Sequence, residues 1–146
     1  DVYKRQEQYH TGNHATIWRW REAYQHDFAA RMDWCISGYE EANHPPVPAL
    51  THPEILEVTE GEQVVLKAEG CSDPDGDELD YQWIYYREAG NSVYWLELEN
   101  EETPDASFTA PTMGLPQAMH FILALTDTGS PALTRYKRVI VKVDPK

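Results

Sequence analysis

Three acidic residues stand at alternate positions in one short stretch of the chain, DPDGD, which supplies Asp73, Asp75 and Asp77. Their carboxylates could converge on Ca²⁺, which takes about six to eight hard oxygen ligands. The glycine that an EF-hand loop has at its sixth position is at the fourth position here, Gly76, and Ile84 stands where the bidentate Glu would be. A calcium site built on this stretch would therefore need further oxygen ligands, from Asp127, Glu78 or a carbonyl group.

The same stretch can also be explained as a turn that holds no metal. Asp side chains accept hydrogen bonds from backbone N–H groups a few residues later, Pro74 fixes its own φ, and Gly76 can adopt a positive φ. Together these properties favour a compact connection into the following strand. The sequence leaves both interpretations open.

Aromatic side chains are abundant, with nine Tyr and five Trp among 146 residues. Exposed aromatic rings can stack against the apolar faces of sugar rings. The candidates for such a platform are the residues that a core does not need, namely Tyr86, Tyr94 and Trp95. Trp95 is the best of them, because alternation in SVYWLEL puts it on the same face as Glu97. Because most aromatic residues on strands belong to a core or an interface, a structural role is the alternative.

The charge balance restricts the partners that the chain can bind. It has 25 Asp and Glu against 12 Lys and Arg, a formal net charge of −13. We do not expect nucleic acid or anionic membranes as partners, because phosphate groups require a basic surface. No run of about 18 apolar residues predicts a membrane-spanning helix. The chain starts without Met and shows no signal peptide, so we expect it to be part of a longer protein.

A helix is predicted from Thr16 to about Trp34, where apolar residues recur every three or four positions. Its apolar stripe consists of Ile17, Trp20, Tyr24, Phe28 and Met32. Thr16 is the expected N-cap, and so broad an apolar face is expected to dock on another surface. The segment SGYEEANHPPVP then predicts a linker. The first six residues, DVYKRQ, resemble translated adaptor sequence from metagenomic reads, so we exclude them from the fold prediction.

After Pro48 the apolar period changes to two, which predicts β-strands. We expect strands at 54–58, 62–68, 79–86, 93–98, 106–109, 118–126 and 134–143, with turn clusters between them. About seven short strands without intervening helices predict a mainly β fold, an immunoglobulin-like antiparallel β-sandwich. Trp83 should lie at the centre of its core, on the same strand face as Tyr81 and Tyr85.

The two cysteines, Cys35 and Cys71, lack the spacing of metal ligands. A disulfide between them would suit a secreted protein. The alternative, which we prefer, is that both thiols are unpaired and buried.

Two parts of the sequence resemble known families. The run CSDPDGDELDYQW resembles a signature of PKD-like and related immunoglobulin-like modules of secreted bacterial proteins, in which the Trp is a core residue. The run ATIWRWREAYQHDFAARMDW, together with EANHPP and LTRYKRVIVKV, resembles a second family. This is the C-terminal third of secreted bacterial proteins that have a nucleoside-hydrolase-like domain and are described as cellulose-binding. The resemblance runs from about Thr11 to Val143.

The second resemblance implies how the chain is divided. Residues 1–44 would be the C-terminal helical remnant of a hydrolase-like domain plus a linker, and residues 45–146 would be the sandwich. The protein would be secreted or periplasmic. In the longer protein, HDFAA would match an H-D-P-x-A element of nucleoside hydrolases, with Asp27 as a Ca²⁺ ligand and His26 as the acid toward the leaving base. Phe28 replaces the Pro, and the Asp-rich element of those enzymes is missing here, so a solvated helix face is the alternative for both residues.

Three hypotheses about function follow. The first is a non-catalytic accessory module that binds a polysaccharide such as cellulose through exposed aromatics. The second is a scaffold that packs against the hydrolase-like domain and binds no sugar. The third is enzymatic, with His26 and Asp27 completing a glycosidic hydrolase site only in the longer protein.

Overall fold

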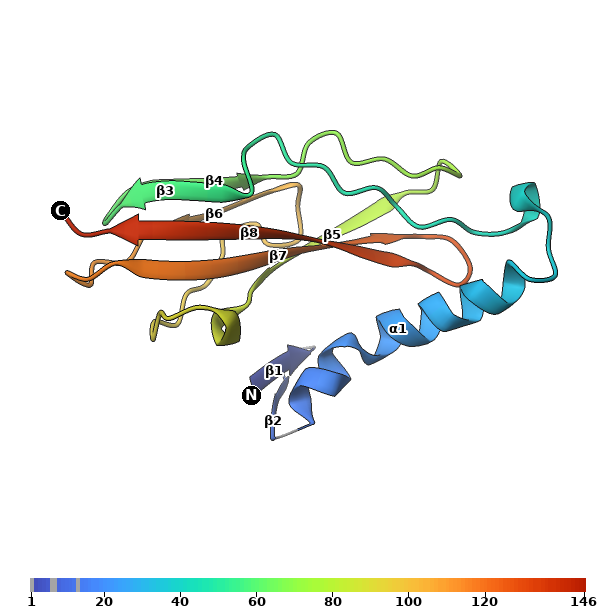
Figure 1. Ribbon diagram of the computed structural model, residues 1–146, viewed down its shortest axis with the longest axis horizontal. Coiled ribbons are helices and arrows are strands. Elements are labelled where there is room, and N and C mark those ends of the chain that lie inside the picture. Colours follow the sequence, from blue (N-terminus) through green and yellow to red (C-terminus); the bar gives the residue numbers. More distant parts are fainter. Residues whose placement is uncertain (1, 6–7, 13) are drawn as a thin grey trace.

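The computed structural model describes residues 2–5, 8–12 and 14–146 (Figure 1). Strands β1 (Val2–Arg5) and β2 (Gln8–Thr11) form a small antiparallel sheet that leads into helix α1 (Ala15–Asp33). Of the stretch DVYKRQ, Asp1 and Gln6 lie outside the described residues, and the other four residues form β1. Among the described helices, none combines the length and apolar character that a membrane span requires.

Helix α1 confirms the helix predicted from the 3.6-residue period, although the predicted N-cap is wrong. The N-cap is His14, without a side-chain cap bond, because the chain enters the helix two residues before Thr16. At the other end, the Trp34 backbone N–H donates to the carbonyl of Ala30, and this bond closes the last turn. A short 3-10 helix, η1 (Tyr39–Glu41), follows in the predicted linker.

The rest of the chain is mainly β, and we call residues 55–144 the β domain. One sheet has the order β3 (Ile55–Thr59), β8 (Thr134–Asp144), β7 (Gln117–Asp127), β5 (Leu79–Tyr85). A second sheet pairs β4 (Gln63–Lys67) with β6 (Asp105–Thr109), and a 3-10 helix, η2 (Arg87–Ala89), follows β5. The prediction of antiparallel pairing is wrong for one pair, because β3 runs parallel to β8.

Six of the seven predicted strands form within the described residues after Pro48. The exception is 93–98, which is not a strand, so that prediction is wrong. Leu96 and Leu98 still pack against the core, which explains the alternating pattern. Among the described residues, the backbone of 93–98 belongs to no strand, and the next paired position along the chain is the bridge between Glu99 and Ser107. The alternation of apolar and polar residues therefore reflects which side chains are buried. The backbone does not form the pairing that defines a strand.

Both sheets of the β domain contribute to one hydrophobic core. The Phe108 ring from β6 stacks on the Phe121 ring from β7, with centroids 4.7 Å apart. Trp83 is 1% exposed, which confirms its predicted position in the core. Its indole N–H donates to the carbonyl of Pro104 over 3.3 Å, so the one polar atom of the ring has a partner in the interior.

Helix α1 lies alongside the four-stranded sheet, with its C-terminal end near the turn between β7 and β8 (Figure 1). Trp20 packs edge-on against Tyr86 and Tyr136, with ring centroids 6.1 and 5.1 Å away. The Arg19 guanidinium forms an ion pair with Glu88 at 2.7 Å. The N-terminal half of the helix is therefore held by residues of the β domain.

Candidate functional site

The loop Asp73–Asp77, which we call the acidic loop, is closed by its own first side chain. Asp73 Oδ1 accepts hydrogen bonds from the backbone N–H groups of Asp75 (2.8 Å) and Asp77 (3.2 Å). Gly76 has φ +83°, a conformation that residues with a Cβ adopt rarely. These contacts confirm the compact turn that the sequence predicts.

Asp75 fastens the acidic loop to the linker. Its Oδ2 accepts from the His44 backbone N–H at 2.6 Å, and its Oδ1 lies 2.9 Å from His44 Nδ1. Burial raises the pKa of Asp75, but the two hydrogen bonds from His44 outweigh it and the net shift is downward. Both oxygens of Asp75 are thus engaged within the protein.

The pKa of Asp77 is shifted in the opposite direction, upward. Burial raises its pKa, and the carboxylates of Asp73, Asp127 and Asp75, in that order, raise it further. Asp127 is 1% exposed at the end of β7, and its register partner is Leu79, two residues after Asp77. The Asp127 carboxylate, which comes from β7, therefore repels the Asp77 carboxylate at the end of the acidic loop.

Two carboxylate oxygens in this region are buried without a hydrogen-bond partner among the described residues, Asp73 Oδ2 and Asp127 Oδ2. One oxygen each of Asp73, Asp75 and Asp77 can be chosen so that all three lie within 4.8 Å of one another. Hard oxygen ligands of this kind suit Ca²⁺. Because Asp75 is occupied by His44, the oxygens that fit the ion best are those of Asp73 and Asp77, with Asp127 as the neighbour that the sequence suggests.

The three predicted platform aromatics lie in different environments. Trp95 is 64% exposed, and the Arg87 guanidinium carbon lies 4.4 Å from its ring centroid. Tyr94 is exposed beside it. Tyr86 is only half-exposed, because Trp20 packs on its ring and the Arg19 guanidinium lies 5.2 Å from its centroid. Trp95 and Tyr94 are thus exposed as a platform requires, while Tyr86 mainly supports α1.

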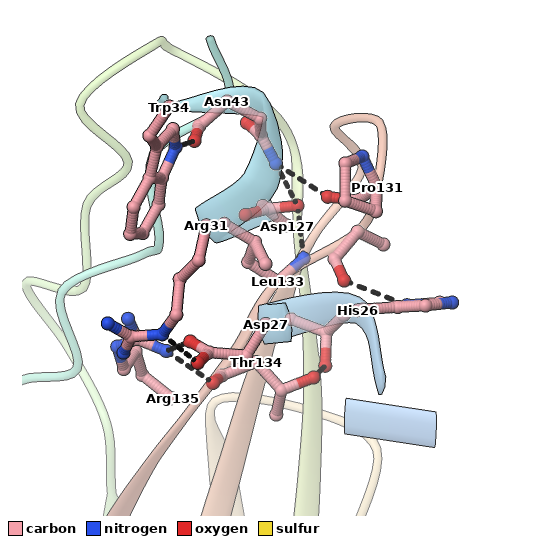
Figure 2. Close-up of polar contacts among 12 residues, drawn as sticks. His26, Asp27, Arg31, Trp34, Asn43, Asp127, Pro131, Leu133, Thr134 and Arg135 are labelled. Atoms are coloured by element: carbon pink, nitrogen blue, oxygen red, sulfur yellow. Dashed lines mark hydrogen bonds and ion pairs between the residues drawn. The ribbon is translucent and has the colours of Figure 1, made fainter. Parts of the chain in front are cut away.

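His26 and Asp27 face the β domain. His26 Nδ1 lies 2.9 Å from the carbonyl oxygen of Ala132, in the turn between β7 and β8. Asp27 lies between two guanidinium groups, Arg31 at 2.6 Å and Arg135 at 3.2 Å (Figure 2). The hydrogen bond from Arg31 lowers the pKa of Asp27, burial opposes this effect, and Arg135 lowers the pKa again. In this chain both residues anchor the helix.

Asn43, in the linker, completes a polar contact that the sequence does not reveal. Its amide donates to Asp127 Oδ1 at 3.2 Å and to the carbonyl of Pro131 at 2.9 Å (Figure 2). The backbone carbonyl of Asn43 accepts a hydrogen bond from the Trp34 indole N–H at 2.8 Å. The linker is therefore fixed between the helix and the β7–β8 turn.

A cavity of about 350 Å³ lies where the end of α1 meets this linker. Its aromatic walls are Trp34, Tyr39 and His44. The cavity is not predicted from the sequence, because the prolines and the glycine after the helix indicate only a connection. The available signal was the spacing of these three aromatic residues in the linker and just before it.

The cysteines are both free, Cys35 exposed and Cys71 partly buried. The Cys71 thiol contacts the backbone of Ala68 and Ala49, which leaves it a packing role. The preferred prediction of unpaired thiols is therefore confirmed, although Cys35 is not buried.

Comparison with known proteins decides the family. The model of the family described as "Cellulose-binding protein Sde0182, C-terminal domain" matches residues 63–143, more than half of the chain. The chain belongs to this family. No curated protein matches it.

Solved structures similar to this member of the Sde0182 C-terminal family include the following two. One is a nucleoside hydrolase-related hypothetical protein from Saccharophagus degradans that is associated with carbohydrate metabolism, at 37% identity and a TM-score of 0.82. The match covers 94% of this chain but only 35% of that protein. The other is the PKD domain from KIAA 1837 protein, at 20% identity and a TM-score of 0.50, over 66% of this chain and 86% of that domain. The second likeness supports an immunoglobulin-like fold.

Proposed function

We propose that this chain is a non-catalytic module that binds a neutral polysaccharide, a cellulose-like glucan, through Trp95 and Tyr94. The observation that carries the proposal is the 64% exposure of Trp95 with the Arg87 guanidinium over its ring. A large aromatic ring that is held in place and left in water is the feature by which proteins stack on sugars. The description of the family as cellulose-binding supports the same ligand class.

Affinity electrophoresis in gels that contain soluble β-glucan, with pull-down on insoluble cellulose, tests this function. Wild-type protein should be retarded, and Trp95→Ala should bind about tenfold more weakly, because the stacked ring is lost. Tyr24→Ala is the matched control, since Tyr24 is also an exposed aromatic, on the outer face of α1. Wild-type mobility that is the same with and without glucan would exclude the proposal.

We propose further that Ca²⁺ binds at the acidic loop, held by Asp73, Asp75 and Asp77, with the buried carboxylate of Asp127 as a neighbouring charge. The support is the pair of buried carboxylate oxygens without partners, together with the raised pKa of Asp77. A cation at this point would relieve the repulsion among these carboxylates. It would stiffen the turn, and no chemistry is assigned to it.

Thermal unfolding at increasing Ca²⁺ concentration tests the cation site. An ion that binds only the folded chain must raise Tm. Asp77→Asn should remove that rise while the fold remains. If Ca²⁺ and Mg²⁺ leave the Tm of the wild-type chain unchanged to within 1 °C at millimolar concentration, the loop is only a turn.

A second candidate function, that of a scaffold for a hydrolase-like domain, is favoured by the outer face of α1. The stripe residues Ile17, Tyr24, Phe28 and Met32 are about half exposed or more. An apolar face of this size usually contacts a partner. The protein from Saccharophagus degradans is nearly three times as long as the part that matches, so we propose that a preceding hydrolase-like domain covers this face.

Hydroxyl-radical footprinting tests this scaffold role by comparing the present chain with a longer protein that includes the preceding domain. Tyr24, Phe28 and Met32 should be oxidised in this chain and protected in the longer one, whereas Trp95 should react alike in both. Equal oxidation of the α1 face in both proteins would contradict the contact. We extend the role of His26 and Asp27 as acid and Ca²⁺ ligand only to that longer protein, since here both bind the β domain.

We also propose how the chain is divided and where the protein acts. Residues 1–44 form the helical remnant and linker, and residues 45–146 form an immunoglobulin-like β-sandwich that contains the family match at 63–143. A module that binds cellulose must meet its ligand outside the cytoplasm. We therefore place the protein in the periplasm or outside the cell.

A further inference from the structure

We propose that the cavity between the end of α1 and the linker is a second carbohydrate site, which holds one pyranose unit of a neutral glucan. We call it the linker pocket, defined by Trp34, Tyr39 and His44 with Ala42 and Pro45. The inference rests on the proposed polysaccharide-binding function. It adds a separate place on the molecule and a separate set of residues.

The walls of the linker pocket are flat aromatic rings. The rings of Trp34 and His44 are nearly parallel, with an interplanar angle of 12° and centroids 6.4 Å apart. The Tyr39 ring packs on His44 with centroids 3.9 Å apart and is itself 68% exposed. A volume of about 350 Å³ is within the range of small-ligand sites, about 300–1,000 Å³. Ligands with apolar faces, such as sugar rings, suit such walls.

Hydrogen bonds fix two of these rings, those of Trp34 and His44, before any ligand arrives. The Trp34 indole N–H donates to the carbonyl of Asn43, whose side chain binds Asp127 and Pro131. Asp75 holds His44 through both the backbone N–H and Nδ1. A pocket whose walls are already ordered loses little conformational entropy on binding. The contact with His44 also gives Asp75 a structural role, holding the linker, that does not depend on a cation.

The polar groups of the linker pocket favour an uncharged ligand. His44 Nε2 makes no hydrogen bond to the described residues, and the Ser37 and Tyr39 side chains add hydroxyl groups that can bind sugar hydroxyls. None of the lining residues is Asp, Glu, Lys or Arg. Anionic ligands are disfavoured by Glu40 and Glu41 next in sequence and by the net charge of −13.

The indole N–H resonances of Trp34 and Trp95 report the two sites separately. We expect both signals to move when cellohexaose is titrated into the ¹⁵N-labelled 146-residue chain, and Trp34→Phe and Trp95→Phe assign them. Tyr39→Ala should weaken the response at Trp34 about tenfold and leave the response at Trp95 unchanged. Tyr24→Ala should change neither response.

Each result decides one of the two proposals. A shift at Trp95 without a shift at Trp34, or a Trp34 response that Tyr39→Ala does not weaken, overturns the linker pocket and leaves the proposed function standing. A shift at Trp34 alone, lost in Tyr39→Ala, supports the pocket and removes Trp95 from the proposed function. If neither signal moves, both proposals fail. Because Tyr39 is mostly exposed, its replacement should leave the Tm unchanged, which checks that the fold persists.

Discussion

Asp127 is an acidic residue at the end of the buried row on β7, directly after the apolar run from Met119 to Leu125. Its Oδ1 accepts hydrogen bonds from the backbone N–H groups of Leu133 (2.9 Å) and Gly129 (3.0 Å), across the turn that joins β7 to β8. The Asn43 amide reaches the same oxygen from the linker (Figure 2). One carboxylate therefore organises the turn on which both α1 and the linker rest.

Replacing Asp127 tests this assignment. We expect Asp127→Ala to lower the free energy of unfolding by about 3 kcal/mol, because the N–H of Leu133, a fully buried residue, would lose its acceptor. Urea unfolding measures the change. Asp144→Ala, at the exposed end of β8, is the control and should stay within about 0.5 kcal/mol of wild type. A similar stability for both variants would show that water can replace the side chain.

The acidic loop should show opposite pH dependence at two neighbouring carboxylates. The pKa of Asp77 is raised in the folded chain, so its protonated form stabilises the fold below the usual value of 3.8, and this stability is lost as the pH rises through the folded pKa. Asp77→Asn should therefore melt above wild type at pH 7 in EDTA, and the two should converge near pH 3.

Asp75 provides the comparison within the same loop. Its pKa is lowered in the folded chain, so its stabilising effect is present above the usual value of 3.8 and is lost as the pH falls through the folded pKa. Asp75→Asn should melt below wild type at pH 7. Thermal melts by circular dichroism between pH 3 and pH 7 measure both effects. The same sign for both variants at pH 7 would contradict the electrostatic account.

At the scale of elements, α1 depends on the β domain for its position. A free helix of 19 residues is marginally stable in water, so contacts at Trp20, His26 and Asp27 must hold it. The side chains that point toward the β domain are mostly polar or small, and much of the apolar stripe points away from it. The helix thus has two contact faces of different chemistry.

Truncating Trp20 should loosen the helix without unfolding the β domain. We expect Trp20→Ala to weaken the packing of α1 on the β domain by about 2 kcal/mol of free energy, because a half-buried indole loses its contacts with Tyr86 and Tyr136. The helical circular dichroism signal should melt before the fluorescence of the buried Trp83 changes. Phe28→Ala, on the exposed face, should leave both transitions in place. A single shared transition in Trp20→Ala would mean that helix and β domain unfold as one unit.

The same elements show how far the sequence could predict the structure. The period of two located β3 to β8 because each buries one face, and the row that contains Trp83 faces the core as expected. Residues 93–98 followed the same alternation, but Leu96 and Leu98 pack on the core without a paired backbone. Hydrophobic periodicity reports which side chains are buried and cannot report hydrogen bonding between strands.

The candidate site was less predictable, because its contacts join distant parts of the chain. DPDGD identified the turn through local chemistry, and Asp73 closes it as expected. The partners of Asp75 and Asp127, His44 and Asn43, lie in a linker whose prolines and glycine suggested only a connection. No local pattern gives the direction of such a segment relative to a sheet. The linker pocket could therefore be found only in three dimensions.

For the whole molecule, the core and the accessory segments are separable. Every fully buried side chain of the hydrophobic core cluster comes from residues after Gln63, on β4 to β8 or next to them. The N-terminal segments add contacts at one end of this body, through Asn43, His44 and α1. This arrangement predicts a domain that folds without its helix but is less stable.

Residues 45–146 expressed alone should therefore keep a β-rich circular dichroism spectrum and the blue-shifted fluorescence of buried Trp83. Loss of the Asn43 bond to Asp127 and the His44 bonds to Asp75 should lower the unfolding free energy by about 2 kcal/mol. That difference corresponds to a Tm about 8–16 °C lower for a domain of this size. The shortened chain also lacks Trp34 and Tyr39, so its glucan binding should depend only on the site of Trp95 and Tyr94. An unfolded fragment would show that the linker and helix are integral to the domain, because the cluster around Trp83 would then be too weak to fold by itself.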